Sequence, residues 1–188
     1  MLPDFTPEGL LPPGDHVLTF DQLRASPLVQ GPRDDPGLPW DKKWRGHLVD
    51  NLEIMVGQLH AVGISEIYIA GSFVERDRQR PPGDIDGYFL CDFDDFASTD
   101  LATRLNALDR HQVWDWQTRI FDPGDPTKPK LRMWQMYHVE LFPTWRPPPQ
   151  ETVCNIFDEN NCNQTWAQAF RKSRRFEARG IIRIGDSP

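Results

Sequence analysis

The stretch EIYIAGSFVERDRQRPPGDIDGYFLC, residues Glu66 to Cys91, decides the fold of this chain. Its first part, Glu66 to Ala70, is a short apolar run of the length expected for a buried strand. Gly71 and Ser72 follow, and a glycine there suits a sharp turn or a close approach of the backbone to a ligand. The stretch therefore predicts a strand, a tight turn, a charged excursion and a second strand.

The second strand opens with two acids, Asp84 and Asp86, on either side of Ile85. Side chains alternate along a strand, so the two carboxylates point to one face and Ile85 points to the other. Two neighbouring carboxylates repel each other unless a cation lies between them. Hard oxygen ligands of this kind favour Mg²⁺ or Mn²⁺. The pair therefore predicts a divalent metal site at the start of the second strand.

The region from Ile67 to Leu90 resembles the polymerase-β-like nucleotidyltransferases, in which a strand and a Gly-Ser turn precede an Asp-x-Asp pair. The resemblance implies that Gly71 and Ser72 hold the phosphates of a bound nucleoside triphosphate (NTP). It also implies that the acid pair and a third carboxylate from a later strand bind two metal ions. The segments LLPPGDH (Leu10 to His16) and RGIIRI (Arg179 to Ile184) are similar to a small uncharacterised bacterial branch of this superfamily.

Two later acids are candidates for the third carboxylate. Glu140 lies in Trp134 to Phe142 (WQMYHVELF), which alternates well enough to be a strand and stands where the superfamily places its last acid. Asp115, within an expected strand from Val113 to Phe121, is the alternative. Strand character favours Glu140, although Asp is more usual in the family at this position. The expected catalytic and metal-binding set is therefore Asp84, Asp86 and Glu140.

The segment from Trp40 to Val62 has the strongest helical pattern in the chain. Its apolar residues recur at steps of three and four and form one stripe: Trp44, Leu48, Leu52, Met55, Leu59 and Val62. Gly63 follows in the position that favours a helix end. The first turns carry four basic residues, which are either a solvated face or cations that face an anionic ligand: Lys42, Lys43, Arg45 and His47.

Shorter elements complete the predicted fold. Helices are expected at 21–25, capped by Thr19, at 98–109, and at 165–177, where the pattern is basic and amphipathic. A loop is expected at 124–129, and a short strand at 181–184. Together these elements predict an α/β (α+β) fold with a small mixed β-sheet flanked by helices. One domain spans 1–188, with a Pro-rich arm (1–39), a catalytic core (40–146) and a C-terminal linker, basic helix and strand (147–188).

Composition and charge narrow the possible functions. The formal charge of −7 argues against a broadly basic surface that coats nucleic acid. Two basic clusters among aromatic residues are either an RNA-binding surface or ordinary solvated surface: Lys128, Lys130 and Arg132, and Arg171, Lys172, Arg174, Arg175 and Arg179. The three cysteines form no CxxC pair, and no apolar run is long enough to span a bilayer. A cytoplasmic protein with no membrane contact, disulfide framework or zinc site is expected.

The resemblance implies a metal-dependent enzyme that transfers a nucleoside monophosphate from an NTP to a hydroxyl on RNA, protein or a small molecule. Small bacterial enzymes of this type act in toxin–antitoxin or phage-defence systems, which implies a possible toxin–antitoxin partner. The alternative is a weakly active or inactive scaffold that serves as an antitoxin or partner-binding module. A glycosyltransferase also uses Asp-x-Asp, but 188 residues are few for that fold and the Gly-Ser turn would be unexplained.

Overall fold

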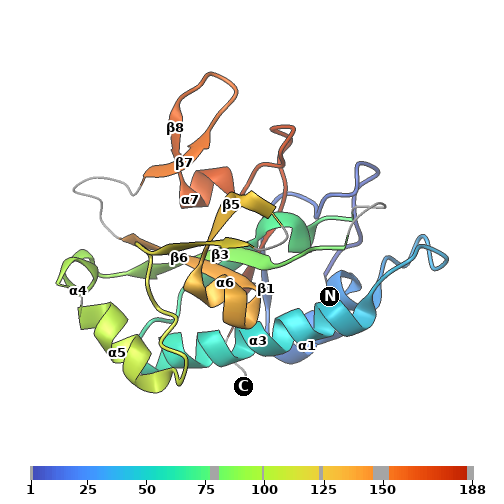
Figure 1. The fold of residues 1–188 in the computed structure, drawn as a ribbon. Coiled ribbons are helices and arrows are strands. Elements are labelled where there is room, and N and C mark those ends of the chain that lie inside the picture. Colours follow the sequence, from blue (N-terminus) through green and yellow to red (C-terminus); the bar gives the residue numbers. More distant parts are fainter. Residues whose placement is uncertain (1, 77–80, 99, 123–124, 146–152, 186–188) are drawn as a thin grey trace.

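The computed structural model describes residues 2–76, 81–98, 100–122, 125–145 and 153–185 of the chain. At its centre lies a five-stranded sheet in the order β1–β9–β2–β3–β6 (Figure 1). The strands are β1 (Asp15–Leu18), β9 (Ile181–Ile184), β2 (Ile67–Ala70), β3 (Ile85–Cys91) and β6 (Val139–Trp145). β1 is parallel to β9 and β3 is parallel to β6, whereas β2 is antiparallel to both of its neighbours. The predicted small mixed sheet in an α+β protein is confirmed.

Helix α3 (Lys42–Ala61) packs along one face of this sheet, and α1 (Phe20–Arg24) lies on the same side (Figure 1). The side chain of Asp41 caps α3 by accepting a hydrogen bond from the amide of Trp44. Gly63, with a φ of 91°, follows its last turn. The predicted apolar stripe faces the core: Trp44 and Val62 are half-buried against it, and four residues have no exposed surface, Leu48, Leu52, Met55 and Leu59. The helix and its orientation were therefore predicted correctly.

The N-terminal segment, expected as a Pro-rich arm (1–39), forms β1, α1 and α2 (Pro27–Gln30). Its apolar side chains are part of the hydrophobic core. Thr19 forms the expected cap of α1, as part of a capping box with Gln22. Leu10, Leu11, Leu18 and Phe20 are buried, whereas Val17 is 56% exposed. The guanidinium of Arg45 is buried and donates to the carbonyls of Leu28, Phe73 and Glu75. Arg45 thus holds α2 and the turn after β2 against α3, and does not face a ligand.

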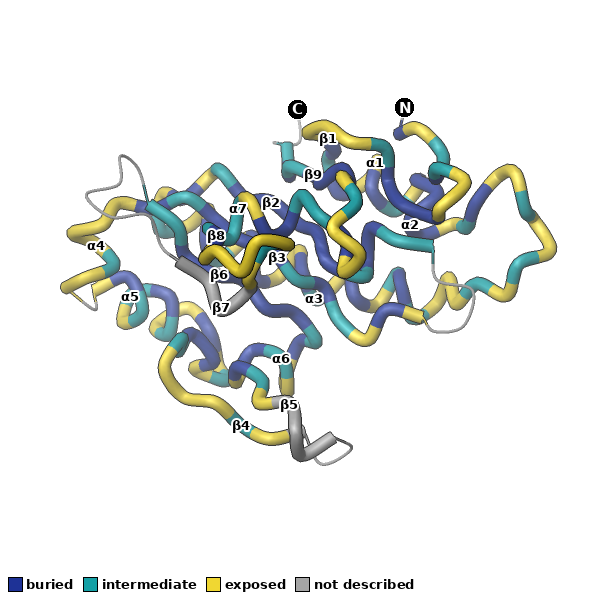
Figure 2. Tube along the Cα trace, turned by 90° about the horizontal axis from the view of Figure 1, so that it is seen from above, coloured by how far each residue is buried: buried dark blue, intermediate teal, exposed yellow. Residues whose placement is uncertain are grey.

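The opposite face of the sheet carries α7 (Trp166–Ala169) with the hairpin of β7 (Val153–Phe157) and β8 (Asn163–Thr165) (Figure 1). Aromatic rings pack between α7 and the sheet: Trp166 stacks on Phe142, and Phe170 stacks on Tyr88. A second hairpin, β4 (Arg119–Asp122) and β5 (Asp125–Leu131), projects beside β6. Seen from above, the buried residues follow the central strands, while the β4 region is exposed (Figure 2).

The remaining helices are α4 (Phe93–Ala97), α5 (Asp100–Leu108) and α6 (Arg132–Tyr137). The predicted strand from Val113 to Phe121 is wrong over its first six residues, because β4 begins only at Arg119. The side-chain amide of Asn106 binds both the amide and the carbonyl of Trp114, and these groups therefore do not join a sheet. The predicted loop at 124–129 is also wrong, because residues 125–129 belong to β5, which pairs with β4.

The predicted strand from Trp134 to Phe142 begins too early. Its first four residues belong to α6, His138 adopts a left-handed conformation with a φ of 52°, and β6 begins at Val139. Met133 and Tyr137 lie four residues apart on α6, and both are buried. This spacing is that of one helix face, so the segment forms a helix although its sequence also alternates like a strand. Pro143 does not end β6, since an edge strand tolerates a missing amide donor.

The predicted helix at 165–177 is shorter than expected, because α7 ends at Ala169. Its start is confirmed: Thr165 forms a capping box with Gln168. Beyond it, the hydroxyl of Ser173 accepts from the amides of Arg175 and Glu177, which replaces helical hydrogen bonding with a turn. The expected C-terminal linker begins at residue 147, and residues 147–152 lie outside the described part of the chain. Within those residues, no helix has the length and apolar character needed to cross a membrane.

Candidate functional site

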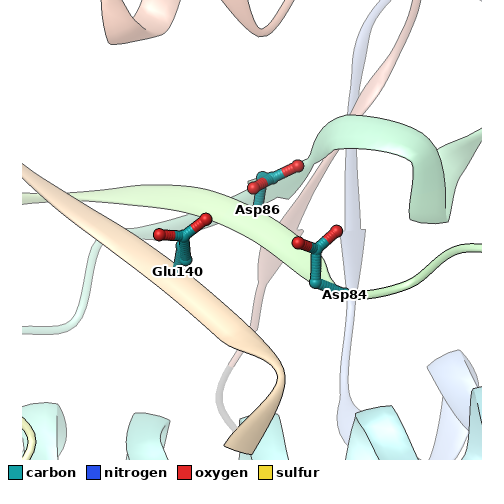
Figure 3. A group of neighbouring side chains, drawn as sticks. All are labelled: Asp84, Asp86 and Glu140. Atoms are coloured by element: carbon teal, nitrogen blue, oxygen red, sulfur yellow. The ribbon is translucent and has the colours of Figure 1, made fainter. Parts of the chain in front are cut away.

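Three carboxylates meet on the face of the sheet that points away from α3 (Figure 3). Asp86 of β3 lies opposite Glu140 of β6 in the parallel register, and Asp84 comes immediately before β3. One oxygen from each side chain lies within 4.8 Å of the others. Asp84 and Asp86 share a face because alternation along the strand places Ile85 in the core, where it is fully buried. We refer to these three residues as the acidic triad.

Two glycines make room for this arrangement. Gly71 begins a single 3₁₀ turn (Gly71–Val74) after β2, with a φ of 68° that L-residues rarely adopt. A Cβ atom on Gly71 would lie 2.3 Å from Oδ2 of Asp86. A Cβ atom on Gly87 would lie 2.3 Å from the carbonyl oxygen of Tyr68 in the neighbouring strand. Gly71 therefore allows the turn to touch the acidic triad, and Gly87 allows β3 to pack against β2.

A lysine contacts two members of the acidic triad directly. The Nζ of Lys130, on β5, donates to Oδ2 of Asp84 at 2.5 Å and to Oε2 of Glu140 at 2.7 Å. The indole Nε1 of Trp134 donates to the same Asp84 oxygen at 2.9 Å. The pairs are well shielded, because the side chains of Asp84 and Glu140 are 13% and 6% exposed. The acidic triad thus already attracts positive charge from its own chain.

Glu140 is the most firmly held of the three acids. Its Oε1 accepts a hydrogen bond of 2.8 Å from the amide of Leu131, while its Oε2 binds Lys130. The guanidinium of Arg119 approaches Oε1 at 3.8 Å from β4. The hairpin β4–β5 therefore places one amide and two cationic side chains on this carboxylate.

The pKa values of Asp86 and Lys130 are shifted because these groups are buried close to other charged groups. Burial, followed by repulsion from Asp84, raises the pKa of Asp86 from 3.8 to about 7. Burial also disfavours the charge of Lys130, but attraction to Asp84 and Glu140 outweighs it and raises the pKa of the lysine above its usual value. Lys130 is therefore held charged by Asp84 and Glu140, whereas the ionised form of Asp86 is disfavoured.

The donor set fits a divalent metal ion. Three carboxylates supply the hard oxygen ligands that Mg²⁺ and Mn²⁺ prefer, and they approach each other from two strands of a rigid sheet. The raised pKa of Asp86 indicates that a further positive charge would be favourable there. Among the described residues, Asp84, Asp86 and Glu140 would be the ligands.

The Gly71-Ser72 turn adjoins the acidic triad, and Arg179 binds the backbone of this turn. The guanidinium of Arg179 is buried and donates to the carbonyls of Gly71, at 3.1 Å, and Phe170, at 3.0 Å, and pairs with Glu75. Ser72 is half-buried, and its carbonyl accepts the amide of Glu75. Only the single 3₁₀ turn, and no longer helix, contains Ser72. The two terminal segments singled out in the sequence also meet here, because β1 pairs with β9.

Other candidate residues lie apart from the acidic triad. Asp115 caps its own loop by accepting from the amides of Gln117 and Thr118. In the charged excursion between β2 and β3, Arg76 pairs with Asp34, whereas Arg78 and Arg80 lie outside the described residues. In the C-terminal basic cluster, Arg171 pairs with Asp15, Lys172 pairs with Glu159, and Arg174 and Arg175 are exposed. Of the two candidates for the third carboxylate, the structure brings Glu140 to the Asp pair.

Sequence reasoning missed four residues that contact the site: Arg119, Lys130, Trp134 and Arg179. Lys130 and Arg179 were grouped with other basic residues as possible RNA contacts, because their charge was visible but their partners were not. Each lies far from its partner along the chain, and Lys130 and Asp84 are 46 residues apart. The pairing of β5 with β4 positions Lys130, and the local sequence pattern, which predicted a loop at 124–129, did not indicate this pairing.

Comparison with known proteins gives a family match but no individual relative. No curated protein and no solved structure matches the chain. Residues 3–185 match a family that is described as a family of unknown function, DUF6932. The match includes all three acids, the Gly71-Ser72 turn and Lys130. Because it covers nearly the whole sequence, the chain belongs to the family DUF6932.

Proposed function

We propose that this chain is a divalent-metal-dependent nucleotidyltransferase, which transfers a nucleoside monophosphate from an NTP to a hydroxyl group. The observation that carries the proposal is the acidic triad beside the Gly71-Ser72 turn, with one oxygen of each acid within 4.8 Å of the others. Phosphoryl-type transfer needs mainly positioning and neutralisation of charge, and a carboxylate-bound metal beside a phosphate-binding turn provides both.

Each residue has a distinct role in this proposal. Asp84, Asp86 and Glu140 would hold Mg²⁺ or Mn²⁺, which supplies activation of the attacking hydroxyl and neutralisation of the leaving pyrophosphate. Gly71 keeps the turn close to Asp86, and Ser72 offers its hydroxyl and amide to a phosphate of the NTP. Arg179 is a positioning residue, because it binds the carbonyl of Gly71 rather than the substrate.

The likeness to the polymerase-β-like fold is part of the same proposal. It is supported by the order of the elements, with a buried strand, the Gly-Ser turn, a strand with two acids and a later strand with the third. The acceptor is proposed to be RNA, protein or a small molecule, and the setting a toxin–antitoxin or phage-defence system in the cytoplasm. These parts rest on the resemblance of residues 67–90 to that superfamily.

The test is transfer of label from each of the four α-³²P NTPs, with Mg²⁺ or Mn²⁺, to total bacterial RNA and protein. Asp86→Asn removes one ligand with little change of shape, and Asp94→Asn, an exposed acid of α4, is the matched control. Labelling by the wild type and by Asp94→Asn, but not by Asp86→Asn, would support the proposal and identify the acceptor class. Equal labelling by all three proteins would contradict it.

A second candidate is a catalytically inactive scaffold that binds a partner, such as the toxin of a toxin–antitoxin pair. The observation that favours it is the double contact of Lys130 with Asp84 and Glu140, which neutralises part of the acidic triad without a metal. Equilibrium binding of a fluorescent NTP analogue, with Mg²⁺ and with EDTA, separates the two candidates. Metal-dependent NTP binding favours the enzyme, and its absence favours the scaffold.

A further inference from the structure

The ammonium of Lys130 lies between two of the three proposed metal ligands. It donates to Asp84 at 2.5 Å and to Glu140 at 2.7 Å, and it lies 5.5 Å from the centre of the Trp134 ring. Its side chain is 21% exposed, so the contact is largely shielded from solvent. Two acids of the acidic triad therefore each direct an oxygen towards a cation that belongs to the protein itself.

We propose that Lys130 is a tethered counter-ion that competes with the metal for the acidic triad. It neutralises the carboxylates when no divalent ion is bound, and its ammonium must leave before the ion can enter. The inference deepens the proposed function and rests on it, because it concerns the same metal site. The physical reason is that an ammonium 2.5–2.7 Å from two ligand oxygens would lie within a few ångströms of the incoming ion and repel it.

The geometry allows Lys130 to leave without unfolding the site. Its position is the penultimate residue of β5, in a two-stranded sheet separate from the central one. The neighbouring amide of Leu131 binds the other oxygen of Glu140, so that the backbone stays anchored when the long side chain moves. The displaced ammonium therefore remains tethered beside the site.

The direct test is the affinity for Mn²⁺, measured by electron paramagnetic resonance of the free ion on the full chain. Lys130→Met removes the ammonium and keeps an unbranched apolar side chain that is only one atom shorter. Lys172→Met is the matched control, because Lys172 forms a surface pair with Glu159. Lys130→Met is expected to bind Mn²⁺ roughly tenfold or more tightly than the wild type, since a nearby unit charge is removed. Lys172→Met should match the wild type, and adding Asp86→Asn to Lys130→Met should weaken binding again.

Thermal unfolding provides a second readout that does not depend on activity. Without Lys130 the three carboxylates repel one another, so Lys130→Met should unfold at a lower temperature than the wild type in EDTA. Mn²⁺ should raise the unfolding temperature of Lys130→Met by more than it raises that of the wild type. This comparison also shows whether the variant is folded.

The outcomes separate this inference from the proposed function. Equal or weaker Mn²⁺ binding by Lys130→Met, with binding that still requires Asp86, would overturn the competition while leaving the metal site in place. If none of the proteins bound Mn²⁺ in a way that requires Asp86, both the competition by Lys130 and the proposed metal-dependent function would be overturned. Tighter Mn²⁺ binding by Lys130→Met than by the wild type supports the inference. Binding by Lys130→Met together with no measurable binding by the wild type also supports it.

Discussion

Gly71 and Asp86 approach so closely that a Cβ atom on the glycine would lie 2.3 Å from Oδ2 of the aspartate. The same glycine has a φ of 68°, in the left-handed region that an L-residue occupies only with strain. The turn after β2 and the acidic triad are therefore parts of one site, because the turn can take its position only where a side chain is missing.

Gly71→Ala is expected to destabilise the protein and to disturb the site. The added methyl group must displace Asp86 or the turn, at a cost of about 1–3 kcal/mol in unfolding free energy. Gly57→Ala is the control, because a Cβ at this position in α3 meets nothing within 4 Å and should be neutral or stabilising by about 0.5–1 kcal/mol. Urea unfolding of both variants measures the difference. If the two variants proved equally stable, the close approach of Gly71 to Asp86 would be wrong.

The titration of Asp86 predicts how stability depends on pH. Burial raises its pKa from 3.8 to about 7, so between these values the native state holds a proton that the unfolded state has lost. This residue therefore lowers the unfolding free energy as pH rises through that window, by up to about 1.4 kcal/mol per pH unit. Asp86→Asn removes this titration and should flatten the decline, which urea unfolding at a series of pH values can measure.

Asp94→Asn is the control for that series, because Asp94 lies exposed on α4. Its pH profile should follow that of the wild type. Parallel profiles for the wild type and Asp86→Asn would mean that Asp86 ionises normally in the folded protein, contrary to the crowding described.

Glu140→Gln tests which acid completes the acidic triad. Glutamine keeps an oxygen that can accept the amide of Leu131, but it loses the charge. Mn²⁺ affinity should fall by about ten- to a hundredfold or more, because a charged ligand becomes a neutral one and even the hydrogen-bond partners of metal ligands contribute on that scale. Asp115→Asn keeps the acceptor for its own loop amides and should leave Mn²⁺ affinity unchanged. The opposite result, with Asp115→Asn the weaker binder, would move the third carboxylate to Asp115.

Arg179→Met should destabilise the protein more than the loss of a surface cation. The substitution leaves Glu75 unpaired and the carbonyls of Gly71 and Phe170 without their donor, at a cost of about 3–5 kcal/mol. Arg171→Met breaks the exposed pair with Asp15, where about 1 kcal/mol or less is expected. Thermal or urea unfolding of the two variants compares them. Similar losses in both would indicate that Arg179 does not anchor the turn.

Much of the fold could be predicted because its signals are local. The stripe of α3, the caps at Thr19 and Thr165 and the buried strand β2 each depend on residues a few positions apart. Prediction failed where the hydrogen bonds of a polar side chain, rather than the apolar pattern, decide the backbone conformation. The side chain of Asn106 binds the backbone amide and carbonyl of Trp114, which then form no strand. The hydroxyl of Ser173 binds a following amide, and the expected C-terminal helix ends early. In both cases a polar side chain supplies bonds that the apolar pattern does not reveal.

The sequence by itself determined the Asp84–Asp86 pair on one strand face and the glycine turn before it, because strand alternation and glycine geometry are local properties. The tertiary structure alone decided that Glu140 lies beside Asp86, because that contact depends on the parallel register of β3 and β6. It also decided the contacts of Lys130, whose partners are 10 and 46 residues away. Long-range strand pairing brings these charges together, and no local pattern in the chain specifies that pairing.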